Sequence, residues 1–191
     1  MQKAVPIGIG AMAAILGLDL YAVENIAAQA AQTQICQAAN DNDPNQVVIS
    51  GHLEAVERAI KIAKESGAKR AILLPVSAPF HCKLMQPAAD IMEEALSQVI
   101  IKKPTAPIVS NYLAKSVFEP RDIKDSLVDQ IMGRVRWRES VEYLYENGVK
   151  HVYEVGAGKA LSGMIKRVNK DISCQNISSP EDLNKILLKE N

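Results

Sequence analysis

Several features are missing from the 191-residue sequence, and each absence narrows the class of protein. The 22 basic and 22 acidic residues balance, so no excess charge exists to attract nucleic acid or an anionic membrane. No apolar run approaches the roughly 18–20 residues that a membrane span requires. Residues 1–6 lack the apolar centre and cleavage site of a secretory signal. We therefore expect a protein whose partners include neither nucleic acid nor a membrane.

Cysteine is also scarce, since the sequence contains only Cys36, Cys82 and Cys174. An odd number of widely separated cysteines argues against a disulfide framework and is typical of the reducing cytoplasm. No two of them have Cys-x-x-Cys spacing, and the three histidines are scattered. We therefore predict a cytoplasmic protein without a metal site.

The most informative absence is that of a Gly-x-Ser-x-Gly nucleophile elbow, which occurs nowhere in the 191 residues. A candidate base is nevertheless present. The segment Ser77-Ala-Pro-Phe-His81-Cys82 follows an apolar run and precedes an amphipathic helix, which places His81 on a strand-to-helix connection. A lone histidine is more often a structural residue bonded to a carbonyl, but catalytic groups concentrate on such connections. We expect His81 to deprotonate a hydroxyl that these residues do not supply.

Two further sequence patterns could mark functional sites but favour structural interpretations. Cys82 could form a nucleophile pair with His81, but adjacent side chains point in different directions, so we expect a packing residue. Gly156-Ala-Gly158-Lys159 follows a predicted strand and resembles a phosphate-binding turn. It lacks both the full Walker pattern and the third glycine of the dinucleotide fingerprint, so a tight strand-to-helix turn is the better interpretation.

Two polar stretches also have structural interpretations. Asn40-Asp-Asn-Asp-Pro-Asn45 is made of turn residues and predicts a loop. Asn40 and Asn42 could line a polar site there, although such a loop requires no ligand. Three arginines flank Trp137 and are expected to form a solvated basic edge at a helix start: Arg134, Arg136 and Arg138.

Residues 10–77 predict a compact unit. The expected elements are a strand at 11–16, a helix at 20–32 capped by Asp19, strands at 35–39 and 47–50, a helix at 53–66 and a strand at 71–76. The order strand-helix-strand-strand-helix-strand is typical of a ferredoxin-like split βαβ unit. The remaining residues predict an α/β layer, with helices at 84–99, 123–132 and 137–147, extended chain at 108–111, a strand at 151–155 and a helix ending near 168.

Five segments carry a resemblance to a known family: Gly10-Ala-Met-Ala-Ala-Ile-Leu-Gly17, Gln46-Val-Val-Ile-Ser-Gly-His52, Leu74-Pro-Val-Ser-Ala-Pro-Phe-His81, Val135-Arg-Trp137 and Glu154-Val-Gly-Ala-Gly-Lys159. In this order they are similar to the C-terminal portion of malonyl-CoA:acyl carrier protein transacylase, the loading enzyme of bacterial fatty acid synthesis. The resemblance implies a partial α/β-hydrolase-like acyltransferase core with an inserted ferredoxin-like subdomain. Residues 10–77 would form the insert, and residues 78–191, with 1–9 as a remnant, would belong to the core.

The resemblance also implies a mechanism. In the family a serine attacks the malonyl thioester, a histidine takes the serine proton, and the acyl-enzyme passes malonyl to the phosphopantetheine thiol of acyl carrier protein. The family histidine falls on His81, and the main-chain carbonyl of Gln130 would orient it. Malonyl-CoA and acyl carrier protein would be the partners, and no cofactor is implied because malonyl-CoA is the substrate.

Substrate contacts follow from the same resemblance. Phe80 would narrow the acyl pocket, while Asn40 and Asn42 would lie near the substrate channel. The sequence departs from the family where Asp41, Asp43 and Asn45 alter the loop, and where Ala157 replaces a proline. It also contains no counterpart of the nucleophile elbow, the Gly-Gln-Gly loop or the arginine that binds the malonyl carboxylate.

Three interpretations stay open. The chain could be a truncated or split transacylase, inactive alone and requiring a separate N-terminal segment that supplies the serine. It could instead be a non-catalytic module that binds acyl carrier protein. A third possibility is an independent ferredoxin-like ligand-binding domain with an appended α/β region. Missing core strands would expose apolar surface, so we expect poor solubility or pairing with another chain.

Overall fold

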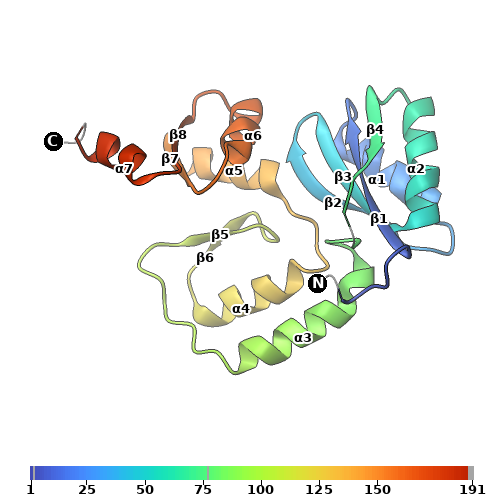
Figure 1. Cartoon of the computed structure of the whole chain (residues 1–191), viewed down its shortest axis with the longest axis horizontal. Coiled ribbons are helices and arrows are strands. Elements are labelled where there is room, and N and C mark those ends of the chain that lie inside the picture. The colour runs from blue at the N-terminus through green and yellow to red at the C-terminus, as the bar shows by residue number, and fades with distance from the viewer. Residues whose placement is uncertain (2, 77, 189–191) are drawn as a thin grey trace. The chain divides into compact units, whose positions relative to one another are not determined.

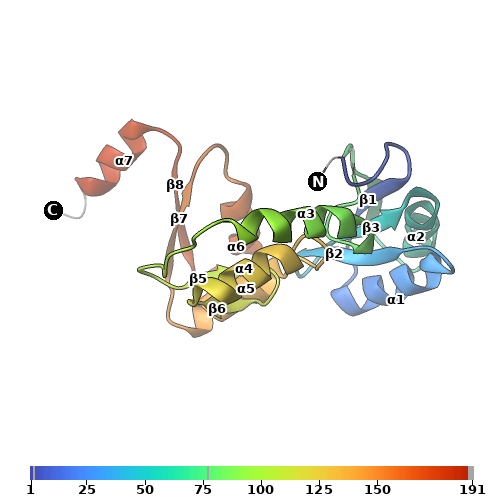
Figure 2. The same cartoon turned by 90° about the horizontal axis from the view of Figure 1, so that it is seen from below.

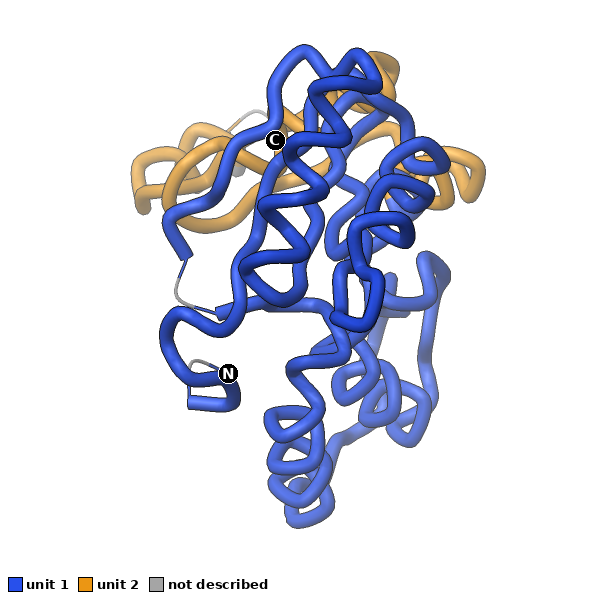
Figure 3. Tube along the Cα trace, turned by 90° about the vertical axis from the view of Figure 1, so that its right-hand side faces the viewer, with its two compact units in different colours: residues 1–140 blue, residues 141–191 orange. Residues whose placement is uncertain are grey.

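The computed structural model describes residue 1, residues 3–76 and residues 78–188, without the side chain of residue 187. Ser77, part of the segment that pointed to His81, lies outside the described residues. The chain forms two compact units, Met1–Ser140 and Val141–Asn191 (Figure 3). Each unit is described by itself.

Unit 1 begins with a four-stranded antiparallel sheet covered by two helices (Figure 1). Its elements are β1 (Gly10–Leu16), α1 (Leu20–Ala31), β2 (Cys36–Asp43), β3 (Gln46–His52), α2 (Leu53–Glu65) and β4 (Arg70–Leu73). The strands are ordered β2-β3-β1-β4, and β1 pairs with β3 from Gly10 opposite His52 to Leu16 opposite Gln46. The order of elements along the chain agrees with the sequence prediction.

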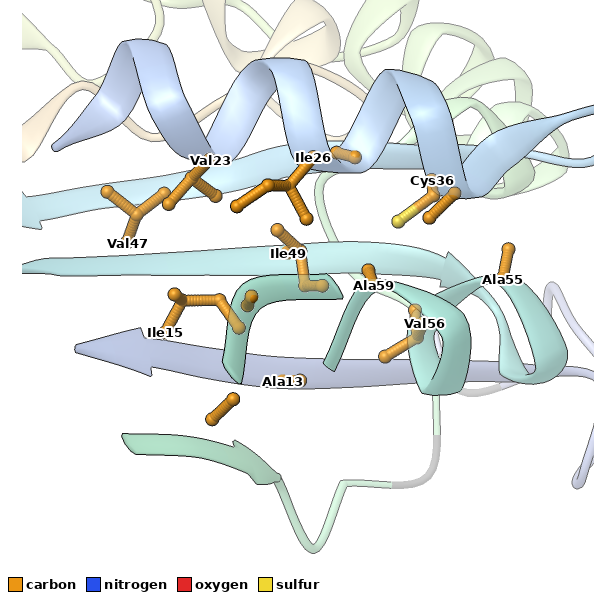
Figure 4. Packing of buried hydrophobic residues seen from close by; sticks show 14 of the residues in the cluster. Ala13, Ile15, Val23, Ile26, Cys36, Val47, Ile49, Ala55, Val56 and Ala59 are labelled. Atoms are coloured by element: carbon orange, nitrogen blue, oxygen red, sulfur yellow. The ribbon is translucent and has the colours of Figure 1, made fainter. Parts of the chain in front are cut away.

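The main core lies between this sheet and its two helices (Figure 4). Alternate residues of β1, such as Ala13 and Ile15, point to the helices because successive side chains of a strand face opposite sides. Ile49 of β3 packs beside them, and the helices contribute valine, isoleucine and many alanines. The Asp19 carboxylate caps α1 as predicted, accepting from the Ala22 N–H at 2.8 Å.

Two boundaries of the sheet differ from the sequence prediction. The turn-rich stretch predicted as a loop continues as β2 through Asp43, and only Pro44 and Asn45 form the turn. Asn40 pairs with Val48 and Asp43 with Gln46, with a register shift on either side of Asp41. These bulges let a stretch of turn residues stay in the ladder. At the other edge, β4 ends at Leu73 instead of at position 76. Pro75 has no backbone N–H to donate, so the strand cannot continue through it.

The rest of unit 1 is a helix pair and a short hairpin. A 3₁₀ turn η1 (Lys83–Met85) leads into α3 (Gln86–Ser97), whose first turn accommodates Pro87. Strands β5 (Ile108–Ser110) and β6 (Lys115–Val117) form the hairpin, and α4 (Pro120–Asp129) follows it. Helix α4 starts three residues earlier than predicted because Pro120 occupies its first turn. Helices α3 and α4 run side by side in both views (Figures 1 and 2).

Helix α5 (Trp137–Glu146) begins in unit 1 and ends in unit 2. Unit 2 then contains β7 (His151–Val155), α6 (Ala160–Val168), β8 (Ser173–Ile177) and α7 (Pro180–Leu187). Strands β7 and β8 pair in parallel, from His151 opposite Ser173 to Val155 opposite Ile177. Of the helices in the described part of the chain, none has the length and apolar character needed to cross a membrane.

Candidate active site

His81 lies in the connection between β4 and η1 and has a left-handed backbone, with φ of 60°. Few residues other than glycine adopt this conformation, and it persists where the surrounding structure enforces it. Part of that structure is Pro79, which is fully buried against β1. A Cβ added to Gly10 would lie 2.3 Å from Cγ of Pro79, so only glycine lets the connection approach the strand so closely.

The imidazole of His81 is held by one defined partner. Its Nδ1 lies 2.7 Å from the main-chain oxygen of Gln130. A carbonyl oxygen can only accept, so Nδ1 carries the proton, and Nε2 of the neutral ring has a free lone pair. A half-buried ring in this tautomer can accept a proton at Nε2, as a general base does.

Gln130 has a free carbonyl because of its place at the end of α4. It is the C-cap residue of that helix, and its own N–H donates to the carbonyl of Ser126 at 3.1 Å. The last carbonyls of a helix have no partner within the helix, so this oxygen is available to His81. No motif in the sequence distinguishes Gln130, and only the family resemblance indicated it.

A mainly apolar cavity of about 580 Å³ borders this pair of residues. His81, Gln130 and Phe80 all line it. The other described lining residues are Met1, Met92, Leu127 and Ile131. His81 also lines a second cavity of about 420 Å³, to which Gln37 of β2 and Arg134 contribute polar groups. Asn40 and Asn42 lie half-buried on β2 and are absent from the described lining of both cavities.

Neither buried cysteine of unit 1 is an activated nucleophile. Burial raises the pKa of Cys82, whose Sγ donates to the carbonyl of Pro79 at 3.2 Å. Burial, and then the nearby Cys82, raise the pKa of Cys36 to about 12. A thiol must lose its proton to attack, so both are packing residues at neutral pH.

The three arginines around Trp137 are not a solvated basic edge, and that sequence interpretation was wrong. Arg134 pairs with Glu24 and Glu139, Arg136 pairs with Glu139, and their side chains are only 24% and 35% exposed. Arg138 binds the carboxylate of Asp41, with Nε 3.2 and 3.1 Å from its two oxygens and Nη2 2.9 Å from Oδ2. Burial raises the pKa of Asp41, and the hydrogen bond and charge of Arg138 act in the opposite direction.

In unit 2, the glycine turn between β7 and α6 is structural. Glu154 at the end of β7 accepts from the N–H groups of Leu161 and Ser162 at 3.0 and 2.7 Å. The bond from the Ser162 hydroxyl, and then these backbone bonds, hold the pKa of Glu154 below its usual range. The carboxylate occupies the positive end of α6, which a phosphate would otherwise use. The sequence had favoured a plain turn but had not indicated Glu154 as its cap.

No family model matches the sequence. Curated proteins do match it. It is 47% identical over 180 residues to the malonyl CoA-acyl carrier protein transacylase of Escherichia coli K12, covering 94% of this chain and 58% of that protein. The transacylase of Bacillus subtilis is 45% identical over 184 residues, covering 96% of this chain and 58% of that protein.

This chain resembles malonyl CoA-acyl carrier protein transacylases over nearly its whole length. Solved structures agree. The acyl-carrier-protein S-malonyltransferase of Burkholderia pseudomallei superposes with a TM-score of 0.94 at 46% identity, covering 98% of this chain and 61% of that one. The transacylase of Coxiella burnetii gives 0.95 at 40% identity, with 98% and 60% covered. The chain thus spans about 58% of the length of the curated relatives it matches.

Proposed function

We propose that this chain carries the general base of a malonyl-CoA:acyl carrier protein transacylase. The main support is the 2.7 Å contact between Nδ1 of His81 and the carbonyl oxygen of Gln130, beside an apolar cavity. The similarity to transacylases at 47% identity supplies the substrate class. Within the fold, the β2-β3-β1-β4 order of the antiparallel sheet supports a ferredoxin-like subdomain at residues 10–77. Residues 78–191 would then be part of an α/β-hydrolase-like core.

The proposed chemistry has two balanced halves. Nε2 of His81 accepts the proton of a serine hydroxyl while the serine oxygen attacks the thioester carbon of malonyl-CoA. The tetrahedral intermediate then expels the coenzyme A thiolate, which takes the proton from the imidazolium. In the second half, His81 deprotonates the phosphopantetheine thiol of acyl carrier protein, that thiol attacks the malonyl ester, and serine leaves with the proton. The serine must come from an elbow that these 191 residues do not contain.

Phe80 is the residue through which this chain would select its acyl group. Its ring lines the cavity beside His81 and packs between two buried clusters. A ring held in that position limits the room beside the acyl chain and disfavours a methyl branch, although one methyl group is worth only about 1–3 kcal/mol. Asn40 and Asn42 are proposed as more distant substrate contacts. The free thiols of Cys36, Cys82 and Cys174 fit a cytoplasmic enzyme.

The test combines this chain with a second polypeptide, the part of the E. coli relative that this chain does not match. Transfer of labelled malonyl from malonyl-CoA to holo acyl carrier protein should require both polypeptides. His81→Gln should reduce that transfer by roughly 10²–10⁴-fold, because it removes a general base. His151→Gln, at an exposed histidine of unit 2, is the matched control and should leave the transfer rate unchanged.

Two outcomes contradict the proposal. A stable malonyl adduct on this chain alone would show that the nucleophile lies within these residues. Equal rates for the His81→Gln variant and the unchanged chain would remove the base from the mechanism. Tight binding of acyl carrier protein without any transfer would instead favour a non-catalytic binding module.

A further inference from the structure

The carbonyl of Gln130, which binds the His81 ring, belongs to a short segment that is hydrogen-bonded to α4 at one end and to β2 at the other. We call residues 130–138 the strap. At its start, the N–H groups of Met132 and Gly133 return to the carbonyl of Asp129 at 3.3 and 2.8 Å. A Cβ on Gly133 would lie 2.3 Å from the ring of Tyr112, so the backbone of the strap packs directly against that ring. This end of the strap is therefore fixed to α4.

The other end of the strap is fixed to β2, the edge strand of the sheet. Val135 forms a parallel bridge with Asn40. The N–H of Asp41 donates to the carbonyl of Val135 at 2.9 Å, and the N–H of Val135 donates to the carbonyl of Ala39 at 2.8 Å. Two backbone bonds at the edge of a sheet do not by themselves prevent the strand from sliding or fraying.

The Asp41–Arg138 ion pair adds a third, directional attachment at this point. The Asp41 side chain is 1% exposed, and the guanidinium of Arg138, at the start of α5, donates to both of its carboxylate oxygens. A guanidinium that contacts both oxygens of a carboxylate fixes orientation as well as distance. Because Asp41 also donates the backbone bond to Val135, the pair joins strand and strap at one residue.

Strand β2 also contacts the histidine-bearing connection. The side-chain oxygen of Gln37 accepts from the N–H of Lys83, two residues beyond His81, at 3.0 Å. Strand β2 thus contacts both the backbone that follows His81 and the strap that carries its partner carbonyl. Because the strap is fixed to the end of α4, a displacement of the strap along β2 would shift that end of the helix as well and move the Gln130 oxygen relative to Nδ1 of His81.

We propose that the Asp41–Arg138 pair is a positioning device for His81, which holds the strap in register on β2 and so keeps the Gln130 carbonyl on Nδ1. The proposal rests on the proposed role of His81 as the base. The pair touches no reacting atom and acts only through the position of that carbonyl.

The test reads the tautomer of His81 directly, by ¹⁵N chemical shifts of the imidazole nitrogens in this chain at a pH where the ring is neutral. His→Gln variants at each of the three histidines assign the signals. The unchanged chain should show His81 protonated on Nδ1. Arg138→Gln and Asp41→Asn should each lose this pattern and give the mixture of tautomers of a ring in water. The double variant should lose no more than either single variant, since the two residues act as one unit.

His52 provides an internal reference in the same spectrum. Its Nδ1 accepts from the N–H of Ile35 at 2.9 Å, so its proton resides on Nε2, and it lies in the same sheet at the end of β3. The proposal requires that His81 changes while His52 does not. Arg121→Gln, which removes an exposed ion pair with Asp125 on α4, is the matched control and should alter neither histidine.

An unchanged His81 tautomer in both single variants would overturn the proposal. Simultaneous loss of the His81 and His52 patterns would also overturn it, because the pair would then stabilise the whole unit instead of the strap. A role of His81 other than base would leave this spectrum as expected and would appear only in the transfer assay. Failure of the positioning pair and failure of the proposed function are therefore distinguishable.

Discussion

At the scale of single residues, the site depends on close backbone approaches that only small residues permit. Two such approaches involve glycines of the sheet. Gly10 lies against Pro79 of the connection that carries His81, and Gly51 lies against Ile35, just before β2. A Cβ on Gly51 would lie 2.0 Å from the carbonyl oxygen of Ile35, which cannot rotate away as a side chain could. The same carbonyl accepts from the N–H of His52 at 2.8 Å, so a shift there would also disturb the junction of β3 and α2.

Gly51→Ala should therefore destabilise unit 1 by about 1–3 kcal/mol or more, as overpacking of a well-ordered core does. Urea unfolding followed by circular dichroism would measure the change. Gly163→Ala is the matched control. It lies in α6, where the nearest atom to an added Cβ is Nη1 of Arg167 at 3.6 Å, and alanine should stabilise that helix by up to about 1 kcal/mol. Equal effects of the two substitutions would contradict the crowding at Gly51.

At the scale of elements, the apolar pattern predicted the helices and strands of the sheet, whereas local composition misplaced their ends. Residues 40–43 have turn composition, yet they stay in β2 because bulges, the bridge to Val135 and the bond from Arg138 satisfy their polar groups. The contacts with Val135 and Arg138 join residues almost a hundred positions apart, which no local pattern reveals. Two of the arginines were misjudged for the same reason, since Arg134 pairs with Glu24 of α1 and Arg138 with Asp41 of β2. The partner of Arg136, Glu139, lies only three residues away.

In the candidate site too, the sequence itself indicated some residues and not others. The Pro-flanked connection pointed to His81 from the sequence itself, because it combines a strand end, a proline and a titratable group. Gln130 acts through its backbone oxygen, so its side chain gives no signal, and only the resemblance indicated it. The catalytic roles of His81 and Gln130 stay predictions, as do the substrate contacts of Phe80, Asn40 and Asn42.

Helix α6 gives a test of pH dependence at this scale. Its N-terminus is capped by Glu154, whose pKa is lowered first by the Ser162 hydroxyl and then by backbone N–H groups. A carboxyl with a lowered pKa in the folded state adds stability above its unfolded pKa and loses it as pH falls through the folded value. Amide hydrogen exchange at Leu161 and Ser162 should therefore accelerate, beyond its intrinsic pH dependence, as the solution becomes acidic below the usual value of 4.5.

Glu154→Gln should remove this acid-induced change and leave the two amides less protected at neutral pH. Glu146→Gln, at the last residue of α5, is the comparison variant and should retain the acid-induced change. If the Glu154→Gln variant kept the same pH response as the unchanged chain, the carboxylate would not be the cap that governs α6.

At the scale of the whole molecule, both units leave large apolar side chains in water. Ile7, Ile91 and Ile100 are exposed in unit 1, and Val155 is exposed in unit 2. The edge strand β4 adds Ile72 and Leu73. Apolar surface of this kind next to an open sheet edge favours association.

We therefore expect the isolated chain to associate as its concentration rises, which sedimentation velocity would detect. The double substitution Ile91→Lys and Ile100→Lys should reduce that association, because it replaces apolar surface at and beyond α3 by charge. Gln98→Lys adds charge in the same region without removing an apolar side chain, and should reduce association less. A monodisperse monomer at every concentration would show that these exposed residues do not drive contact between copies.

The positive φ of His81 has a consequence for how the site can be altered. Glycine is the replacement that suits this backbone without strain, whereas alanine or a β-branched residue would oppose it. Removing the ring by His81→Gly leaves the connection relaxed and the Gln130 oxygen ready for a new donor. A glycine at position 81 would therefore keep both the backbone and the acceptor oxygen in place for free imidazole added to the solution.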